Sequence, residues 1–481
     1  MTKGTIVSHT LSDATQISLA AAAGLEAEIS GAVILPDGDG YAAENVVFNL
    51  TQRLEPALVV AAESAADVQA AVRFAAKRGL PVAVKSSGHQ VIQPAHGAIL
   101  VTTDRMDKVE VDPAARIARV EAGVRWQRVI DAAYPHGLAP LSGSSPDVGV
   151  VGYTLGGGQS PTLGRSFGYA ADHVHAVEIV TADGALRRAT PSTEPELFWA
   201  VRGGKGNFGV VTAIEFRLFP VPVLYGGGIY FAGERTADVL RTWANWIPSL
   251  PWEMSTSVAV QRLPALPELP EQLQGAFIVH LRVAYHGAAS EGERMLAPMR
   301  ALGSIVLDTV GEMPYTEVGA IHAEPIDPIP YYDRSVSLRE LTPETVDAFV
   351  DVTGPDSGCP LTSVEIRALG GALDREPAAP NAVPTRGLPF VLFGLGVGGP
   401  GQADELRGYL AKVVDRMQPW SDRLLPPNFL SADEATTVGE LRAVYGADRY
   451  QRLASIKEAY DPANMFRINH NIRPELLNRE P

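Results

Sequence analysis

Hydrophobic residues follow two alternating periods along the first half of this chain, that of a helix and that of a strand. Between residues 64 and 79, apolar side chains recur at the spacing of one helical face, at Val68, Ala71, Val72 and Ala75. Val82 and Val84 then alternate as in a strand. We predict further strands at 98–101, 116–122 and 174–181, and a helix over 126–133. This repeated alternation predicts a sheet that is covered by helices.

The middle of the chain carries a second set of patterns. Residues 277–281 and 390–395 have the composition of strands, and residues 364–367 alternate, so that Glu365 and Arg367 share one face. A helical stripe follows at Leu406, Tyr409, Leu410, Val413 and Met417, which is typical of a helix packed on a sheet. We therefore predict a separate α+β unit, an antiparallel sheet with helices on its outer side.

The predicted strand at 82–84 leads into Ser86-Ser87-Gly88-His89. Small residues let backbone N–H groups approach a ligand closely, and consecutive N–H groups bind anions. His89 follows that nest directly, which suits a cofactor with a pyrophosphate and a reactive ring. Taken alone, His89 is better interpreted as a turn histidine bonded to a backbone carbonyl. The glycine-rich segments further along reverse that preference.

Two glycine-rich segments lie at 142–158 and 203–209. A flexible linker is the simplest interpretation of the first, but its interleaved apolar residues argue against it, since a solvated linker needs none. A rigid loop around a flat cofactor fits better. Neither a phosphate-binding P-loop nor a dinucleotide fingerprint is present, because no Gly-Lys-Ser/Thr follows and the glycine spacing differs.

Composition excludes several kinds of partner. Apolar residues make up 46% of the 481 residues and charged residues 20%, as in ordinary globular proteins. The net charge of −15 argues against a nucleic acid or an anionic membrane as partner. No apolar run approaches the length of a membrane span. Cys359 is the only cysteine, which excludes an internal disulfide and a cysteine cluster for metal. We predict no metal site.

The stretch from residue 17 to residue 25 is small and apolar. Only Lys3 precedes it as a cation and no clear cleavage site follows, so we interpret it as a short helix rather than a signal peptide. Cytoplasmic residence is the default expectation, with secretion as the alternative.

Three ordered motifs together resemble the FAD-linked oxidases of the vanillyl-alcohol oxidase and p-cresol methylhydroxylase superfamily. They are Ser-Ser-Gly-His at 86–89, Gly-Ser-Ser-Pro-Asp-Val-Gly-Val-Val-Gly within 142–158, and Leu-Phe-Trp-Ala-Val-Arg-Gly-Gly-Lys-Gly-Asn-Phe-Gly-Val-Val-Thr at 197–212. The run from Tyr445 to Ile472, which ends in Tyr-Asp-Pro-Ala-Asn-Met-Phe-Arg-Ile-Asn-His-Asn-Ile, resembles the berberine-bridge-enzyme branch. The motifs are long and keep the family's order.

The resemblance implies a fold class and a division of the chain. The fold is α+β, with a two-part FAD-binding domain of the p-cresol methylhydroxylase type and an antiparallel-sheet substrate domain. Residues of about 50–222 and 436–474 match the family. We expect an entry segment, the FAD-binding domain, the substrate domain and a C-terminal segment that completes the FAD site, at 1–50, 51–222, 223–435 and 436–481.

The resemblance also implies cofactor-binding residues. His89 matches the histidine that bonds covalently to the flavin. Ser145 stands where the branch often carries a second, cysteine link, so one covalent bond is expected. The residues expected to bind FAD are Ser86, Ser87 and Gly88 at the pyrophosphate, Ser144, Ser145, Val148, Gly149 and Gly152 at the flavin ring, Gly209 and Val210 on the adenine side, and Asn469 and Asn471 at the flavin edge.

The expected activity is FAD-dependent oxidation of an alcohol, sugar or amine by hydride transfer to flavin, with dioxygen as acceptor and hydrogen peroxide as product. Tyr445 matches a position where relatives place a tyrosine over the flavin and is the first candidate base, with Tyr153 in reserve. Arg367 is expected either to meet an anionic substrate group and lower the pKa of Tyr445, or to lie on a solvated face. A non-redox cyclase and a flavin-binding protein are the rivals. The substrate and the oligomeric state stay open.

Overall fold

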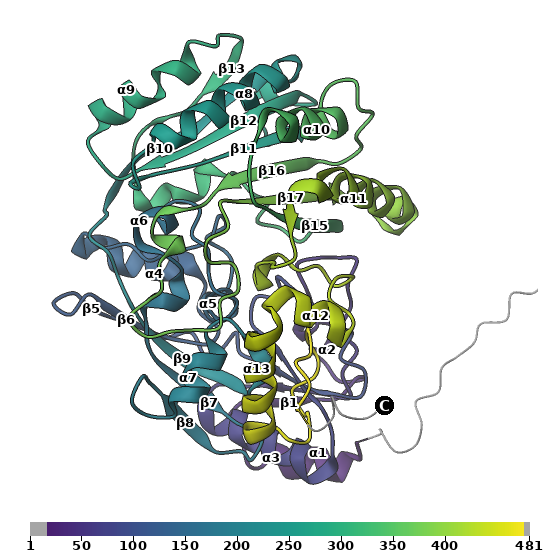
Figure 1. The fold of residues 1–481 in the computed structure, drawn as a ribbon. Helices are drawn as coiled ribbons and strands as arrows, with labels where there is room; N and C mark the ends of the chain where they lie inside the picture. The colour runs from purple at the N-terminus through teal and green to yellow at the C-terminus, as the bar shows by residue number, and fades with distance from the viewer. Residues whose placement is uncertain (1–16, 476–481) are drawn as a thin grey trace, which may run out of the picture.

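A computed structural model describes residues 17–475. The first 16 residues of the expected entry segment and the last six of the C-terminal segment lie outside the described residues. The described chain contains three sheets, which Figure 1 shows as a helix-covered sheet above a two-sheet unit that holds most of the N-terminal half and the C-terminal helices.

The first sheet contains the strand that leads into the Ser-Ser-Gly-His motif. Its order is β1 (Ala32–Ile34), β2 (Leu58–Ala61), β4 (Ile99–Thr102) and β3 (Val82–Lys85), in which β4 runs parallel to both β2 and β3. Helix α3 (Ala65–Arg78) begins where the Ser64 side chain accepts the Asp67 N–H at 3.2 Å. It ends at Gly79, whose φ of +64° needs no Cβ. Helices α1 (Leu19–Glu26) and α2 (Tyr41–Glu44) precede β2.

The second sheet is antiparallel and carries the glycine-rich segments on its connections. Its order is β5 (Val109–Asp112), β6 (Ile117–Glu121), β9 (Val210–Arg217), β7 (Val174–Val180) and β8 (Leu186–Ala189). The helices of this part are α4 (Trp126–Ala133), α5 (Val150–Leu155), α6 (Gly164–Phe167), α7 (Pro195–Val201), α12 (Val438–Tyr445) and α13 (Ala447–Tyr460). The first glycine-rich segment thus includes a helix, α5, which the sequence did not indicate.

The third sheet has nine strands, and all its pairings are antiparallel, as predicted. Its order is β13 (Ile305–Asp308), β10 (Val223–Ala232), β12 (Phe277–Tyr285), β11 (Met254–Arg262), β16 (Ser363–Ala368), β17 (Phe390–Val397), β15 (Tyr331–Leu338) and β18 (Ser421–Asp422), with β14 (Gly311–Pro314) also paired to β10. One face is covered by α8 (Thr236–Trp246), α9 (Ala289–Arg300), α10 (Pro343–Thr353) and α11 (Ala403–Met417) (Figure 1).

The two faces of this third sheet differ in polarity. Val364 and Ile366 pack into the apolar core beneath the covering helices. Strand alternation places Glu365 and Arg367 on the opposite face, where the register sets Arg367 beside Ser257 and Ser257 beside Arg282. Because that face turns toward the first two sheets (Figure 1), its polar side chains are buried between the two halves of the molecule.

The C-terminal segment returns to the first sheet along a fixed path. The Asp461 carboxylate accepts the N–H groups of Met465 and Phe466 at 2.7 and 2.9 Å, and the Lys457 ammonium contacts the same carboxylate. The Met465 carbonyl then accepts the Val82 N–H at 3.1 Å. Residues 468–470 are thereby brought beside the end of β3.

Candidate functional site

A cavity of about 330 Å³ lies where the loop after β3, the two glycine-rich segments and the C-terminal segment meet. Its lining includes these sequence-predicted residues: Ser86, Ser87, Gly88, His89, Ser144, Ser145, Val148, Gly149, Gly152, Tyr153, Gly209, Arg367 and Asn469. Residues from five separate parts of the chain therefore form one cavity, which we call the main cavity.

The serine-rich turn and the first glycine-rich segment form its tightest wall. The Gly149 N–H donates to the Ser87 hydroxyl at 3.3 Å, and a Cβ at position 149 would lie only 3.0 Å from Ser86 Oγ. Gly88 has a φ of +66°, which turns the chain sharply at that point. Ser86 Oγ is buried without a hydrogen-bonding partner among residues 17–475. An orphaned hydroxyl beside a close glycine backbone fits the pyrophosphate of FAD.

His89 contributes an imidazole to the wall of the main cavity. The ring packs on Phe48, with 4.6 Å between the two ring centroids, and neither ring nitrogen has a hydrogen-bonding partner within the described chain. Burial lowers the pKa of His89, while the charge of Glu324 partly opposes that effect. The imidazole is therefore neutral near pH 7 and keeps a nitrogen lone pair, as a nucleophile requires.

Two predicted cofactor residues do not line the main cavity. Val210 is the first residue of β9 and packs in the core of the first sheet, because strand alternation aims Gly209 and Val211 at the cavity and Val210 away from it. Asn471 lies past the lining residues Asn469 and His470, and its Oδ1 is buried without a described partner. We no longer assign either residue to FAD contact.

Tyr445 is not placed as a catalytic base would be. Its ring lies in the hydrophobic core, and its hydroxyl donates to the Gly203 carbonyl at 3.0 Å. It lines neither cavity described here, and burial raises the pKa of its phenol. The structure therefore corrects this prediction: Tyr445 is a packed aromatic side chain with a satisfied hydroxyl.

Tyr153, the reserve candidate, does face the main cavity. Its ring meets Trp126 edge-on, with 5.5 Å between the ring centroids, and its hydroxyl has no hydrogen-bonding partner among the described residues. Burial raises the pKa of Tyr153 well above its usual value, although the charge of Arg367 partly offsets the rise. The charge of Arg367 thus acts on Tyr153 rather than on Tyr445, and Tyr153 stays a phenol that can donate a hydrogen bond.

Arg367 lies in a buried ion-pair network and not on a solvated face. Its Nη2 is 3.0 Å from Glu365 Oε2, and the other carboxylate oxygen of Glu365 is 2.8 Å from Arg282 Nη1. Burial alone would raise the pKa of Glu365, and the two guanidinium groups hold it well below its usual range. Glu365 is shared between the two guanidinium groups, and Arg367 Nε is buried without a hydrogen-bonding partner among the described residues, so the expected contact with an anionic substrate group stays a prediction.

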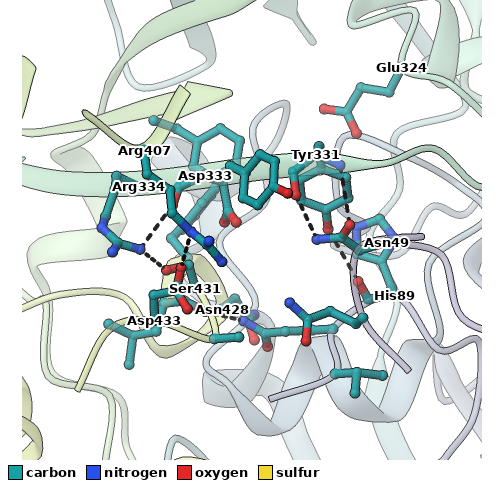
Figure 2. Close-up of a pocket in the computed structure, with 18 of the residues that line it drawn as sticks. Asn49, His89, Glu324, Tyr331, Asp333, Arg334, Arg407, Asn428, Ser431 and Asp433 are labelled. Carbon is teal, nitrogen blue, oxygen red and sulfur yellow. Dashed lines mark hydrogen bonds and ion pairs between the residues drawn. The ribbon is translucent and has the colours of Figure 1, made fainter. Parts of the chain in front are cut away.

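A second pocket of about 150 Å³ adjoins the main cavity (Figure 2). We call it the side pocket; its other walls are formed by β15 and by residues 428–433. The two spaces share lining residues at their junction, namely His89, Gln90, Val91, Ser144, Glu324, Arg367, Asn428 and Phe429. A substrate in the side pocket would therefore lie next to the residue expected to hold the flavin.

Sequence reasoning missed three charged residues of this region. Glu324 lines both spaces and lies 4.0 Å from Arg367 Nη2. Asp333, on β15, lines the side pocket. Lys205 lines the main cavity, where it donates to the Pro427 carbonyl at 3.0 Å and where burial lowers its pKa to about 7. Lys205 interrupts the second glycine-rich segment with a φ of +57°, and a bulky residue at such a position was the available signal.

Other site types find no support in the described chain. From residue 17 to residue 475, no group of three or more His, Cys, Asp or Glu side chains is arranged to bind a metal ion. No helix in that range is both long and apolar enough to cross a membrane.

Two family models match the chain. A FAD-binding domain model matches residues 56–190, and a model described as berberine and berberine like matches residues 428–473. The (R)-6-hydroxynicotine oxidase of Paenarthrobacter nicotinovorans is 29% identical over 483 residues, covering 93% of this chain and 97% of that protein. The xylooligosaccharide oxidase of Thermothelomyces thermophilus is 26% identical and covers 89% of each protein.

Solved structures agree with these matches. The 6-hydroxy-D-nicotine oxidase from Arthrobacter nicotinovorans superposes with a TM-score of 0.80 at 26% identity, covering 93% of this chain and 98% of that one. The xylooligosaccharide oxidase from Myceliophthora thermophila C1 shares the fold with a TM-score of 0.82 at 24% identity, covering 94% and 99%. The fold and these matches support a FAD-dependent oxidoreductase with a p-cresol methylhydroxylase-type FAD-binding domain. Within that class, the resemblance to the berberine-bridge-enzyme branch is confirmed.

Proposed function

We propose that this protein oxidises a small molecule at a C–H bond next to oxygen or nitrogen, and that His89 holds the FAD covalently. When bound, FAD would supply the redox chemistry, namely acceptance of the substrate hydride and reoxidation by dioxygen to give hydrogen peroxide. The observation that carries the proposal is the junction of the two cavities at His89, which leaves room for a substrate beside the cofactor. Relatives named as oxidases of 6-hydroxynicotine and of xylooligosaccharides support it.

A single covalent bond suits the residues around His89. The imidazole is neutral, unpartnered and held against Phe48, so one ring nitrogen is available to the flavin methyl carbon. Ser145, also on the cavity wall, has a hydroxyl where a second link would need a thiol. The lone thiol of the chain, Cys359, is buried under the third sheet's helices and reaches neither cavity.

The proton that leaves with the hydride needs an acceptor at the junction of the two spaces. Glu324 offers a carboxylate that lines both, whereas Tyr153 lines only the main cavity and stays protonated. We therefore assign proton acceptance to Glu324 and hydrogen-bond donation to Tyr153. Arg367, paired with Glu365, positions Glu324 through their 4.0 Å contact.

Acid precipitation of the purified protein tests the cofactor assignment. The yellow colour should stay with the precipitate in the wild type and pass to the supernatant in His89→Ala. His96→Ala is the matched control, because His96 is exposed and lines neither cavity. Flavin that dissociates from the wild type in acid would refute the covalent bond.

Substrate oxidation is tested separately by anaerobic bleaching against a panel of alcohols, sugars and amines. The expected result is loss of the flavin absorbance with at least one donor, followed by peroxide release when oxygen is admitted. Protein that stays yellow with every donor, while keeping its FAD, would instead favour a binding protein or a non-redox enzyme.

A further inference from the structure

We infer that the side pocket binds the positively charged amino group of an amine substrate, with the Asp333 carboxylate as its counter-ion. This inference rests on the proposed function, because the side pocket opens onto the site expected to hold the flavin. It narrows the substrate from alcohols, sugars and amines to amines that carry a positive charge.

The positive charges around the side pocket already have partners. Arg407 on α11 pairs with Asp433 at 2.8 Å, and Arg367 on β16 pairs with Glu365 at 3.0 Å. Arg334, next to Asp333 on β15, donates to the Ser431 hydroxyl and lies 4.0 Å from Glu434. Each of these guanidinium groups thus has a carboxylate within 4.0 Å, although Arg367 Nε is buried without a hydrogen-bonding partner among the described residues.

Among the charged side chains that line this pocket, the Asp333 carboxylate is the one without an ion-pair partner among residues 17–475. It forms neither an ion pair nor a side-chain hydrogen bond with any residue from 17 to 475, although it lines the pocket (Figure 2). The residue is also largely buried, in contrast to an ordinary surface aspartate. Burial, and then the negative charge of Glu434, raise the pKa of Asp333 to about 7. An ammonium group bound beside this carboxylate would stabilise its ionised form against both burial and the charge of Glu434.

Other charged and titratable groups face the same space. Glu324, Arg367 and His89 line both this pocket and the main cavity, and Asp433, Arg407 and Tyr331 line this pocket alone. The imidazole is neutral, and burial raises the pKa of Tyr331, so neither ring carries a charge near pH 7. Three guanidinium groups (Arg334, Arg367 and Arg407) and three carboxylates (Glu324, Asp333 and Asp433) line the pocket, and Asp333 is the one of these carboxylates that has no ion-pair partner among the described residues.

The walls suit an organic ammonium better than an inorganic cation. Tyr331, Tyr332, Phe393 and Phe429 all contribute to the pocket surface. Tyr332 and Phe429 already face the guanidinium groups of Arg407 and Arg367, at 4.7 and 5.3 Å from the ring centroids, which leaves Tyr331 and Phe393 as aromatic walls for an organic cation. A metal ion would need further oxygen ligands instead. A neutral sugar would also find aromatic surface and a carboxylate, but it would leave the Asp333 carboxylate without a counter-ion.

Binding of a permanent cation to the FAD-loaded protein tests this inference. Benzyltrimethylammonium carries a charge at every pH, and its binding can be followed through the flavin absorbance spectrum. Asp333→Asn, which keeps the side-chain shape, should weaken binding by about 10- to 100-fold, the scale of a charge-assisted contact. Asp351→Asn is the matched control, since Asp351 is an exposed aspartate on α10 that lines neither cavity.

The pH dependence gives a second readout that a merely structural effect would not produce. Because the probe keeps its charge, its affinity should rise as Asp333 ionises near pH 7 and level off above that pH. Asp333→Asn should abolish the rise. Glu434→Gln should move its midpoint to lower pH, because it removes the neighbouring negative charge that raises the pKa of Asp333.

Three outcomes would overturn the inference: equal affinity in wild type and Asp333→Asn, an affinity independent of pH between 5 and 9, or tighter binding of neutral benzyl alcohol than of the cation. The last result would assign the pocket to an uncharged hydroxyl compound. Failure of the proposed function is distinguishable, because it would appear as flavin that no donor bleaches, whatever the probe affinities.

Discussion

Replacing Asp461 by alanine should loosen the C-terminal wall of the main cavity. Asp461 and Lys457 are completely buried, and the Asp461 carboxylate also accepts two backbone N–H groups at 2.7 and 2.9 Å. The Lys457 ammonium donates to the Asn207 carbonyl at 2.6 Å, and the Asn207 side chain accepts the Ile472 N–H at 3.0 Å. The substitution therefore removes the charge that links α13, the second glycine-rich segment and residues 465–472.

The loss of unfolding free energy can be estimated in two ways. Breaking a buried ion pair by removing one partner costs about 3–5 kcal/mol of unfolding free energy. Alternatively, Lys457 loses its proton at pH 7. The free-energy cost of holding it neutral is then at most about 1.4 kcal/mol for each pH unit between pH 7 and its unfolded pKa of roughly 10.4, which gives about 4–5 kcal/mol. Burial already lowers the pKa of Lys457 to about 8 in the intact protein, so most of the deprotonation penalty is present before the substitution, and the loss of the ion pair sets the expected cost.

Thermal unfolding of the FAD-loaded protein, followed by flavin fluorescence, measures this effect. A cooperative unit of 150–250 residues loses about 2–4 °C of Tm per kcal/mol, so Tm should fall by at least about 6 °C. Asp351→Ala breaks the exposed ion pair between Asp351 and Arg416 and should change Tm by about 1 °C or less. An Asp461→Ala protein that unfolds within 2 °C of the wild type and keeps its FAD would refute the reasoning.

Three further predictions concern catalysis and pH. Glu324→Gln should slow anaerobic flavin reduction by about 100-fold while FAD content stays unchanged, and Tyr153→Phe should slow it much less. If stopped-flow measurements give the opposite ranking, proton acceptance belongs to Tyr153. In Tyr445→Phe, the flavin should be reduced at the wild-type rate. The variant should lose about 1–3 kcal/mol of unfolding free energy, because it leaves the Gly203 carbonyl unpaired. A large decrease in the rate of flavin reduction would instead support a catalytic role for Tyr445. Burial, aided by the charge of Lys205, lowers the pKa of His470 to about 4 in the native protein. Between about pH 6.5 and pH 4, the His470 imidazole therefore binds a proton in the unfolded chain but not in the native protein. Stability should therefore fall by about 3 kcal/mol as the pH drops from 7 to 4; denaturation of His470→Gln, if equally pH-dependent, would contradict this.

The sequence identified the turns that line the main cavity, because their signals are local. A serine-rich turn after a strand and dense glycine require particular backbone conformations, and these can be recognised without knowing what packs against them. The same holds for the alternation at 364–367, which correctly placed Glu365 and Arg367 on one face. Sequence could not show that Arg282 meets Glu365 from another strand, because that contact depends on the register between strands.

The errors arose where orientation depends on packing. Tyr445 ends α12 on the same side as Leu441 and Val444, and this apolar grouping was a signal that it faces the core. Val210 and Asn471 were predicted from motif matches, but a motif match does not say which of two neighbouring side chains points into the cavity. Asp333 and Glu324 come from β15 and from an irregular segment before it, and only the tertiary structure brings them to His89.

The walls of the main cavity come from residues 82–93, 143–159, 205–211 and 468–470, together with a few contributed by the third sheet's side of the molecule. During synthesis, the first three of these ranges emerge long before residues 468–470, so the nascent chain lacks one wall of the main cavity until its C-terminal segment is made. Closure of this wall therefore depends on the C-terminal segment, which is synthesised last. A truncation just before Asp461 would leave every strand of the three sheets in the polypeptide but would remove the segment that closes this wall. Nicks near this end of the chain should therefore release or expose flavin before they unfold the protein.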